Sequence, residues 1–206
     1  VYGTGYSPNQ NKNLFYKLKL HKKIKLGIFD IREKKKLDKF IIKYKPTIIF
    51  HLAAQPLVNL SFENPLDTLK VNTMGTINLL ESIRLNLRKC IAIFITSDKV
   101  YDNQEWGWGY RENDRLGGSD PYSASKACAE LCISSYFRSY FKSSSKIKIC
   151  SVRAGNVIGG GDWAVNRIIP DCIRSWLKNK PVLLRNPKST RPWQHVLEPL
   201  SGYLKV

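Results

Sequence analysis

The hydrophobic residues of this chain recur with two periods, which predict alternating strands and helices. The β-branched run at 47–52 is typical of a buried strand, whereas apolar residues spaced three or four positions apart between Leu66 and Ile83 predict a long helix. Because strands and helices alternate along the chain, we predict an α/β fold with a doubly wound parallel sheet. The predicted strands are 1–6, 23–29, 47–52, 90–96 and 146–152, and the predicted helices are 33–45, 64–86 and 121–141.

The pattern loosens after the glycines at 159–161. For that part we predict a helix at 165–178, a short strand at 182–184 and loops. Near the start, Gly3 and Gly5 resemble part of a phosphate-binding loop, but no third glycine and no helix follow them, and residues 7–11 have a loop composition. We therefore reject a dinucleotide-binding fingerprint at this position.

Polar residues at the end of the predicted strand 90–96 form the first candidate site. The apolar run stops at residues 96–99, and ligands of open α/β sheets bind outside the carboxyl ends of the strands. The helix predicted from 121 carries Tyr122 and Lys126 four positions apart, on one face. A nearby ammonium lowers the tyrosine pKa from about 10, so Tyr122 beside the hydroxyl of Ser97 can take a proton from an alcohol. The Tyr-x-x-x-Lys spacing alone is more typical of an ordinary half-exposed helix face; the polar strand end 25 positions earlier reverses this and favours catalysis.

The formal net charge of +18 raises the question of an anionic partner. Much of this charge lies between Lys12 and Lys45, where lysine outnumbers arginine and no nucleic-acid motif accompanies it. We interpret this stretch as a lysine-rich solvated surface with a modest attraction for anionic nucleotides, rather than as a nucleic-acid-binding patch.

Composition narrows the protein class. A hydrophobic content of 43% with 24% charged residues is typical of a soluble globular protein, and no run of eighteen apolar residues predicts a membrane span. The N-terminus lacks the regions of a signal peptide, and it also lacks an initiator Met. The five cysteines form no C-x-x-C, and the three His residues are scattered, so we expect no metal site and a reduced, cytoplasmic protein.

Four further segments, 51–58, 105–112, 153–163 and 191–196, join these motifs in a family resemblance. Together they resemble the extended short-chain dehydrogenase/reductases, within them the nucleotide-sugar 4,6-dehydratases, and most closely the branch that acts on CDP-glucose. The resemblance covers nearly all 206 residues. It implies an NAD(P)-binding Rossmann-like fold, NAD as cofactor, a nucleotide sugar (CDP-glucose in this branch) as substrate, and a homodimer.

The resemblance also implies catalytic roles. Tyr122, helped by Ser97 and Lys126, would take the proton of the C4 hydroxyl while hydride leaves C4 for NAD⁺. Asp98 would protonate the departing C6 hydroxyl and Lys99 would remove the C5 proton, after which hydride returns to C6. Such an acid and base must be held in opposite protonation states.

Lys99 stands where many relatives have Glu. A lysine base must be neutral, which requires its pKa to fall from about 10.4. We interpret this lysine as a mark of the CDP-glucose branch. The alternatives are a surface lysine after a strand and, for Asp98, a turn or helix-cap carboxylate.

Cofactor contacts are implied at three further places. Asp30 and Ile31 match residues that flank the adenine, and Asn72 matches a helix position that braces the active site, although it could equally be a helix amide bonded to backbone. Tyr122 and Lys126 would contact the cofactor as well as catalyse. The strand end that would run past the pyrophosphate and ribose consists of Leu52, Ala53, Ala54 and Gln55.

Substrate contacts are implied in the last third of the chain and in one loop. Asn156 and Arg191 match groups that hold the phosphates of the sugar nucleotide, a task suited to the arginine fork; a surface ion pair is the alternative for Arg191. Trp106, Trp108 and Trp163 are candidates for lining the sugar or cytosine pocket, or for packing that anchors their loops.

The resemblance sets expectations for domains and ends. Residues 1–156 would be an incomplete Rossmann-like NAD-binding domain, and 157–206 part of the substrate-binding region. Val1 matches the family's second strand, so the first strand and its Gly-rich turn, which seats the pyrophosphate, do not occur in this sequence. We therefore expect this N-terminally truncated piece, taken alone, to bind NAD poorly and to be inactive.

Two alternatives stay open. A nucleotide-sugar epimerase or reductase of the same family shares Ser97, Tyr122 and Lys126 but does not need Asp98 and Lys99. A non-catalytic, basic nucleotide-binding fragment would explain the charge and the missing glycine loop, and salt-sensitive binding to duplex DNA would favour it.

Overall fold

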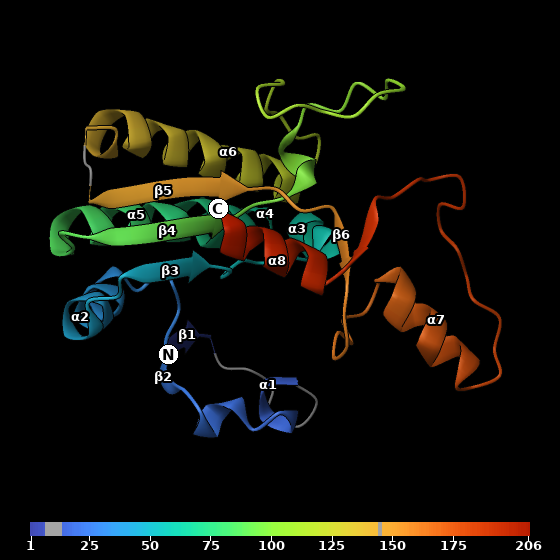
Figure 1. Ribbon diagram of the computed structural model, residues 1–206. Helices are drawn as coiled ribbons and strands as arrows, with labels where there is room; N and C mark the ends of the chain where they lie inside the picture. Colours follow the sequence, from blue (N-terminus) through green and yellow to red (C-terminus); the bar gives the residue numbers. More distant parts are fainter. Residues whose placement is uncertain (7–13, 144–145) are drawn as a thin grey trace. The chain divides into compact units, whose positions relative to one another are not determined.

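The computed structural model describes residues 1–6, 14–143 and 146–206 (Figure 1). These residues fall into two compact units. The sheet unit consists of Leu26–Ala154 together with β1 (Tyr2–Gly5). The β6–β7 unit consists of Gly155–Lys205 together with α1 (Leu14–Lys17) and η1 (Leu20–Lys22). The loop predicted at 7–11 lies almost wholly outside the described residues, and the domain boundary at 156 stays a prediction.

The sheet unit is organised around three parallel strands in the order β3, β4, β5 (Figure 1). β3 (Ile48–His51) pairs with β4 (Cys90–Ile95), which pairs in turn with β5 (Ile147–Val152). Parallel neighbours need a crossover between them, and here helices supply each crossover. The prediction of parallel strands alternating with helices is confirmed.

One face of β4 forms the centre of the hydrophobic core. Cys90, Ala92 and Phe94 alternate along the strand and are fully buried, as expected for side chains that point to the same face. The helices that pack on this face are α2 (Lys34–Tyr44), α5 (Gly75–Asn86) and α6 (Pro121–Tyr136). Their buried apolar residues in the core are Leu37, Ile41, Leu79, Leu80, Ile83 and Ile133.

The strands predicted at 1–6 and 23–29 form a pair of their own. β1 and β2 (Lys25–Ile28) make a two-stranded sheet separate from β3–β4–β5. In the doubly wound order 3-2-1-4-5-6 the second strand is not a neighbour of the fourth. The prediction that β1 corresponds to the second strand of this order stays a prediction.

The helix predicted at 64–86 contains a change of helical type. α4 (Pro65–Leu69) begins with its proline in the first turn, where the missing N–H costs nothing. A π-helical turn, η2 (Lys70–Met74), follows and leads into α5. Single π turns inside helices occur frequently at functional sites. The short helix α3 (Val58–Glu63) precedes these elements and was not predicted.

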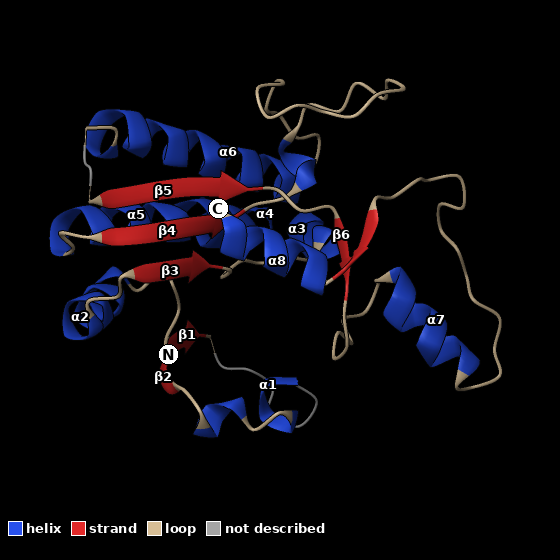
Figure 2. Cartoon of the chain, in the orientation of Figure 1, coloured by secondary structure: helices blue, strands red, loops and turns tan. Residues whose placement is uncertain are grey.

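The helix predicted at 121–141 is likewise α6 followed by a π turn, η4 (Phe137–Phe141). Figure 2 shows that the segment between η3 (Asp98–Val100) and α6 is loop, as predicted.

The β6–β7 unit differs most from the sequence-based expectation. Its helix α7 (Ile168–Trp176) is shorter than predicted, and the strand predicted at 182–184 is wrong: Leu183 lies in irregular structure with 88% of its surface exposed. An apolar triplet has strand propensity, but a strand needs a partner. The pairing here instead joins β6 (Asn156–Ile158) and β7 (Trp193–His195) in parallel, and α8 (Leu197–Lys205) follows.

Among the described residues, no helix has the length and apolar character to cross a membrane. Nor does the described part of the chain bring three or more His, Cys, Asp or Glu side chains together as a metal site.

Candidate active site

The polar residues after β4 form a tight turn. Ser97 is buried and caps η3: its Oγ accepts a hydrogen bond from the Lys99 N–H (3.2 Å) and donates one to Asp98 Oδ1 (3.0 Å). A serine in extended conformation before a helical turn is a favoured cap. The turn leaves Asp98 and Lys99 half-buried at the carboxyl end of the central strand, where ligands of open sheets bind.

Helix α6 begins beside this turn. Asp120 caps it by accepting hydrogen bonds from the Ser123 N–H (2.9 Å) and the Ser123 hydroxyl (2.6 Å). The helix packs against η3, which brings the first turns of α6 to the strand end. Tyr122 and Lys126 are both buried on this helix. The structure therefore brings the two predicted motifs together.

Burial changes the protonation of the groups near Lys126. The Lys126 ammonium donates a hydrogen bond to the carbonyl of Ile95, the last residue of β4 (3.3 Å), and burial lowers the pKa of Lys126 to about 8. Burial, together with repulsion from Lys126, lowers the pKa of His51 to about 3. His51 is therefore neutral, and its Nε2 lies 3.0 Å from Thr76 Oγ1. His51 is therefore a buried core histidine, and the sequence analysis did not assign it to catalysis.

Asn72, in the π turn η2, connects three elements. Its Nδ2 donates to the Gln55 carbonyl (3.1 Å) and to Ser125 Oγ (2.8 Å), while its Oδ1 accepts from the Gln55 N–H (2.8 Å). Thr73 in the same turn donates to the Ser125 carbonyl (3.0 Å). Asn72 is thus buried, and its side chain bonds outside its own helix. It connects Gln55, after the end of β3, to Ser125 of α6, the residue before Lys126. Sequence reasoning missed Ser125, although it lies inside the Tyr-x-x-x-Lys motif.

The strand end after β3 exposes small and apolar side chains. Leu52 and Ala53 are exposed and Ala54 is half-buried, whereas Gln55 is buried and donates to Thr68 Oγ1 (2.9 Å). Small side chains over a fixed backbone let a flat ligand approach closely.

The predicted adenine contacts at the end of β2 are already engaged within the chain. Both oxygens of Asp30 accept hydrogen bonds from Arg32 (2.6–2.9 Å), and this pairing lowers the pKa of Asp30. Ile31 packs against Gly75 at the start of α5, where an added Cβ would lie 2.6 Å from the Ile31 side chain. Their contact with a cofactor stays a prediction.

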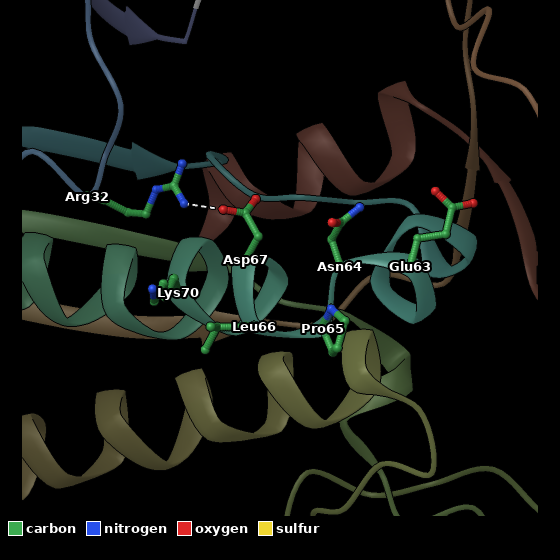
Figure 3. A pocket seen from close by; sticks show the side chains of 7 residues that line it. All are labelled: Arg32, Glu63, Asn64, Pro65, Leu66, Asp67 and Lys70. Atoms are coloured by element: carbon green, nitrogen blue, oxygen red, sulfur yellow. Dashed lines mark hydrogen bonds and ion pairs between the residues drawn. The ribbon is translucent and has the colours of Figure 1, made fainter.

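A pocket of about 420 Å³ opens next to Arg32, and Figure 3 shows its lining. Arg32 pairs there with Asp67 of α4 as well as with Asp30. None of the predicted catalytic residues lines this pocket, so it does not mark the reaction centre. The seven lining residues are Arg32, Glu63, Asn64, Pro65, Leu66, Asp67 and Lys70.

The loop between η3 and α6 carries a stack of aromatic rings. Trp106 stacks on Trp108 (5.1 Å between centroids) and contacts Tyr110, which stacks on Tyr101 (4.7 Å). Trp108 is nonetheless 67% exposed. These contacts agree with the packing interpretation, and a role in a sugar or base pocket stays a prediction.

The predicted phosphate contacts lie in the β6–β7 unit. The Asn156 N–H donates to the carbonyl of Pro192 (3.1 Å), which places Asn156 next to the segment that contains Arg191. Arg191 is exposed, and its Nη1 donates to the Thr190 carbonyl (2.7 Å). Its guanidinium forms no ion pair with a described residue. The alternative prediction, a surface ion pair at Arg191, is therefore wrong for the described residues. Trp163 lies in the same unit and is 41% exposed.

A relative of known activity is similar over most of the chain. CDP-glucose 4,6-dehydratase of Salmonella typhimurium is 52% identical over 198 residues, which cover 94% of this chain and 55% of the relative. The chain thus spans about half the length of this protein.

Two solved structures show the fold. A double mutant of dTDP-glucose 4,6-dehydratase from Streptomyces venezuelae, with NAD bound, has a TM-score of 0.76 at 22% identity and covers 87% of this chain and 53% of its own. UDP-glucose 4-epimerase of Thermus thermophilus, in complex with NAD, has a TM-score of 0.78 at 24% identity. The match covers 99% of this chain and 73% of the epimerase chain. These similarities confirm the Rossmann-like α/β fold. The family model described as GDP-mannose 4,6 dehydratase matches residues 5–205, and the chain belongs to this family.

Proposed function

We propose that the protein containing this chain is a CDP-glucose 4,6-dehydratase, which forms CDP-4-dehydro-6-deoxy-glucose for deoxysugar and lipopolysaccharide-type synthesis. The observation that carries the proposal is the strand end of β4, where Ser97, Asp98 and Lys99 form one turn packed against the helix of Tyr122 and Lys126. The similarity to the Salmonella typhimurium enzyme supports the substrate.

The residues at this strand end suit a nicotinamide dinucleotide. Lys126 is a buried cation with three donors, of which the structure pairs one with the Ile95 carbonyl, so it can still bind ribose hydroxyls. Leu52 and Ala53 are exposed apolar residues, and Asp30 keeps its carboxylate ionised at the end of β2. When bound, NAD would accept hydride from C4 of the sugar and return it at C6.

Side chains of this chain would carry out the proton transfers of the reaction. Tyr122 would take the proton of the C4 hydroxyl, with Lys126 nearby stabilising the phenolate and Ser97 bonding the same oxygen. A ketone at C4 then acidifies the C5 proton. Lys99 would remove that proton while Asp98 protonates the departing C6 hydroxyl. Both residues belong to the turn η3 at the end of β4, which Ser97 caps.

Substrate binding is proposed for Asn156 and Arg191, with the arginine fork on the phosphates of the nucleotide. The exposed guanidinium, which forms no ion pair with a described residue, supports this part of the proposal. Trp106, Trp108 and Trp163 are proposed as contacts to the sugar or cytosine. The basic surface would favour anionic nucleotides over neutral sugars.

We also propose a cytoplasmic homodimer without membrane or nucleic-acid partners. Leu131 of α6 and Phe137 and Tyr140 of the adjoining π turn are exposed apolar residues, which supports association through this helix. Light scattering of the purified protein tests the dimer.

Product mass tests the reaction. The full-length protein would be incubated with NAD and, in separate samples, with CDP-, dTDP-, UDP- and GDP-glucose. We expect a product lighter by one water from CDP-glucose alone. Unchanged masses with every sugar would refute the dehydratase, and water loss from another sugar would refute the base specificity.

An epimerase is the second candidate, because UDP-glucose 4-epimerase of Thermus thermophilus has the same fold. The variants Asp98→Asn and Lys99→Ala separate the two. A dehydratase loses its product with either substitution, whereas an epimerase keeps most of its activity.

A further inference from the structure

A buried ion pair lies next to the catalytic turn. Arg153 donates two hydrogen bonds to Glu130 of α6, from Nε to Oε1 (2.7 Å) and from Nη2 to Oε2 (2.5 Å). Only 15% of the Arg153 side chain and 4% of the Glu130 side chain are exposed. Glu130 also accepts from the hydroxyls of Thr96 (2.6 Å) and Ser151 (3.5 Å). The pairing raises the pKa of Arg153, which keeps it fully charged.

The pair is connected to the turn through the backbone on both sides of Arg153. The carbonyl of Val152 accepts the Thr96 N–H (2.9 Å), and the carbonyl of Ala154 accepts the Asp98 N–H (3.1 Å). These two N–H groups flank Ser97. The side chain of Arg153, between these two carbonyls, anchors the 152–154 segment on Glu130 in addition to the β4–β5 strand pairing.

The same guanidinium reaches the aromatic loop. Its Nη1 donates to the Glu112 carbonyl (3.1 Å), and its carbon lies 4.7 Å from the centre of the Tyr101 ring. Tyr101 stacks on Tyr110, which contacts Trp106. Arg153 therefore ties the loop to the strand end as well as to α6.

This arrangement uses the geometry of arginine. Two nitrogens bond the Glu130 carboxylate and the third bonds the Glu112 carbonyl, while the planar face lies over a ring, a combination that lysine cannot reproduce. Buried ion pairs contribute little to stability relative to well-packed apolar residues. Stability alone therefore does not account for a charged pair at this place.

We propose that Arg153 and Glu130 are positioning residues that set the Ser97–Asp98 turn, and with it the elimination step. The proposal rests on the dehydratase function proposed above. It assigns neither residue a contact with substrate or cofactor.

The test compares Arg153→Lys and Glu130→Gln with a matched control pair. Arg84 and Glu81 on α5 also form two hydrogen bonds (2.6 and 2.8 Å), and Arg84 also lies over a tyrosine ring, but the pair is distant in sequence from the turn and partly exposed. The controls are Arg84→Lys and Glu81→Gln.

The first readout needs neither cofactor nor substrate. Hydrogen–deuterium exchange of the peptide that contains residues 97–100 reports the Asp98 amide bond to Ala154. We expect about tenfold faster exchange in both variants at this peptide, with the control variants matching the wild type. Unchanged exchange in Arg153→Lys and Glu130→Gln would overturn the proposal. If either variant melts well below the wild type, the other variant decides.

The second readout is turnover of CDP-glucose. A displacement of about 1 Å can cost about 100-fold in rate, so we expect kcat to fall by about that factor while KM changes less than about threefold. Equal losses in the Arg84 and Glu81 controls would overturn the proposal. If the wild type releases no dehydrated product, the proposed function fails, and the exchange experiment still decides the role of Arg153.

Discussion

The strand end of β4 and the β6–β7 unit place their candidate residues in opposite ways. In the sheet unit, Ser97, Tyr122 and Lys126 are buried, and cross-links from Asn72 hold the surrounding elements. In the β6–β7 unit, Arg191 is exposed and bonds to its neighbouring backbone carbonyl. The first region is organised before any ligand arrives, as chemistry requires; the second has a side chain whose orientation a ligand can still set.

The largest effect is expected in the buried region, at Tyr122. Tyr122→Phe removes the hydroxyl that would take the C4 proton, and positioned acid–base groups contribute about 100- to 10,000-fold. We expect turnover of CDP-glucose to fall by about 1,000-fold with an unchanged circular dichroism spectrum.

The control lies on the same helix. Tyr136 donates its hydroxyl to Glu81 (3.2 Å), so Tyr136→Phe removes a hydrogen bond of the same kind away from the strand end. Near-normal activity in Tyr122→Phe, or an equal loss in Tyr136→Phe, would remove the catalytic role from Tyr122.

Lys126 is expected to lower the stability of the folded protein while contributing to turnover. Its pKa in the folded protein is about 8, below the ordinary 10.5, so the buried charge destabilises the folded state at neutral pH. A difference of that size corresponds to roughly 3 kcal/mol, since each pKa unit is worth about 1.4 kcal/mol. We expect Lys126→Met to lose about 100-fold in turnover yet to unfold at a higher urea concentration at pH 7.

The sign of the pH dependence follows from linkage. Between about pH 8 and 10.5 the unfolded chain holds a proton on Lys126 that the folded chain has lost, so rising pH stabilises the wild type through this group. The stability advantage of Lys126→Met should therefore shrink across that range. Urea titrations at both ends measure it, with Lys89→Met as the exposed-lysine control; a constant advantage would show that the Lys126 pKa is not lowered.

Smaller effects are expected in the exposed region. Arg191→Ala removes a charge-assisted hydrogen bond worth about 1.5–3 kcal/mol, so KM for CDP-glucose should rise about 10- to 100-fold with kcat nearly unchanged. Asn156→Ala, which loses a neutral hydrogen bond, should raise KM by less.

Arg185 is the matched control, because it is an exposed arginine of the same unit that donates to the Asn166 carbonyl (2.8 Å). A large fall in kcat with Arg191→Ala would show that this region is organised for chemistry rather than only for binding. An equal rise in KM with Arg185→Ala would show a general charge effect.

The sequence predicts the buried region better than the exposed one for physical reasons. Periodicity reports burial, so the strand 90–96, the helices around it and the joining of their polar ends could be predicted. The triplet 182–184 has the same local character as a strand but pairs with no strand among the described residues, and pairing is a long-range property.

Long-range polar contacts also escape prediction. Glu130 and Arg153 are 23 positions apart, and nothing in the spacing shows that one helix and one strand end will bring them together. Asn72 could be assigned only as a braced or a helical amide, since the π turn that directs it toward Ser125 follows from packing rather than from local propensity.

The most direct test of the account uses deuterium. If Lys99 removes the C5 proton and Asp98 releases the C6 hydroxyl, the carbon at C5 must regain its hydrogen from solvent. The full-length protein, NAD and CDP-glucose in D₂O should therefore give a product that has lost one water and carries one deuterium at C5, and Lys99→Ala should give almost none of it. A product that keeps its water and carries no deuterium would contradict the account, because the chemistry would then stop at C4.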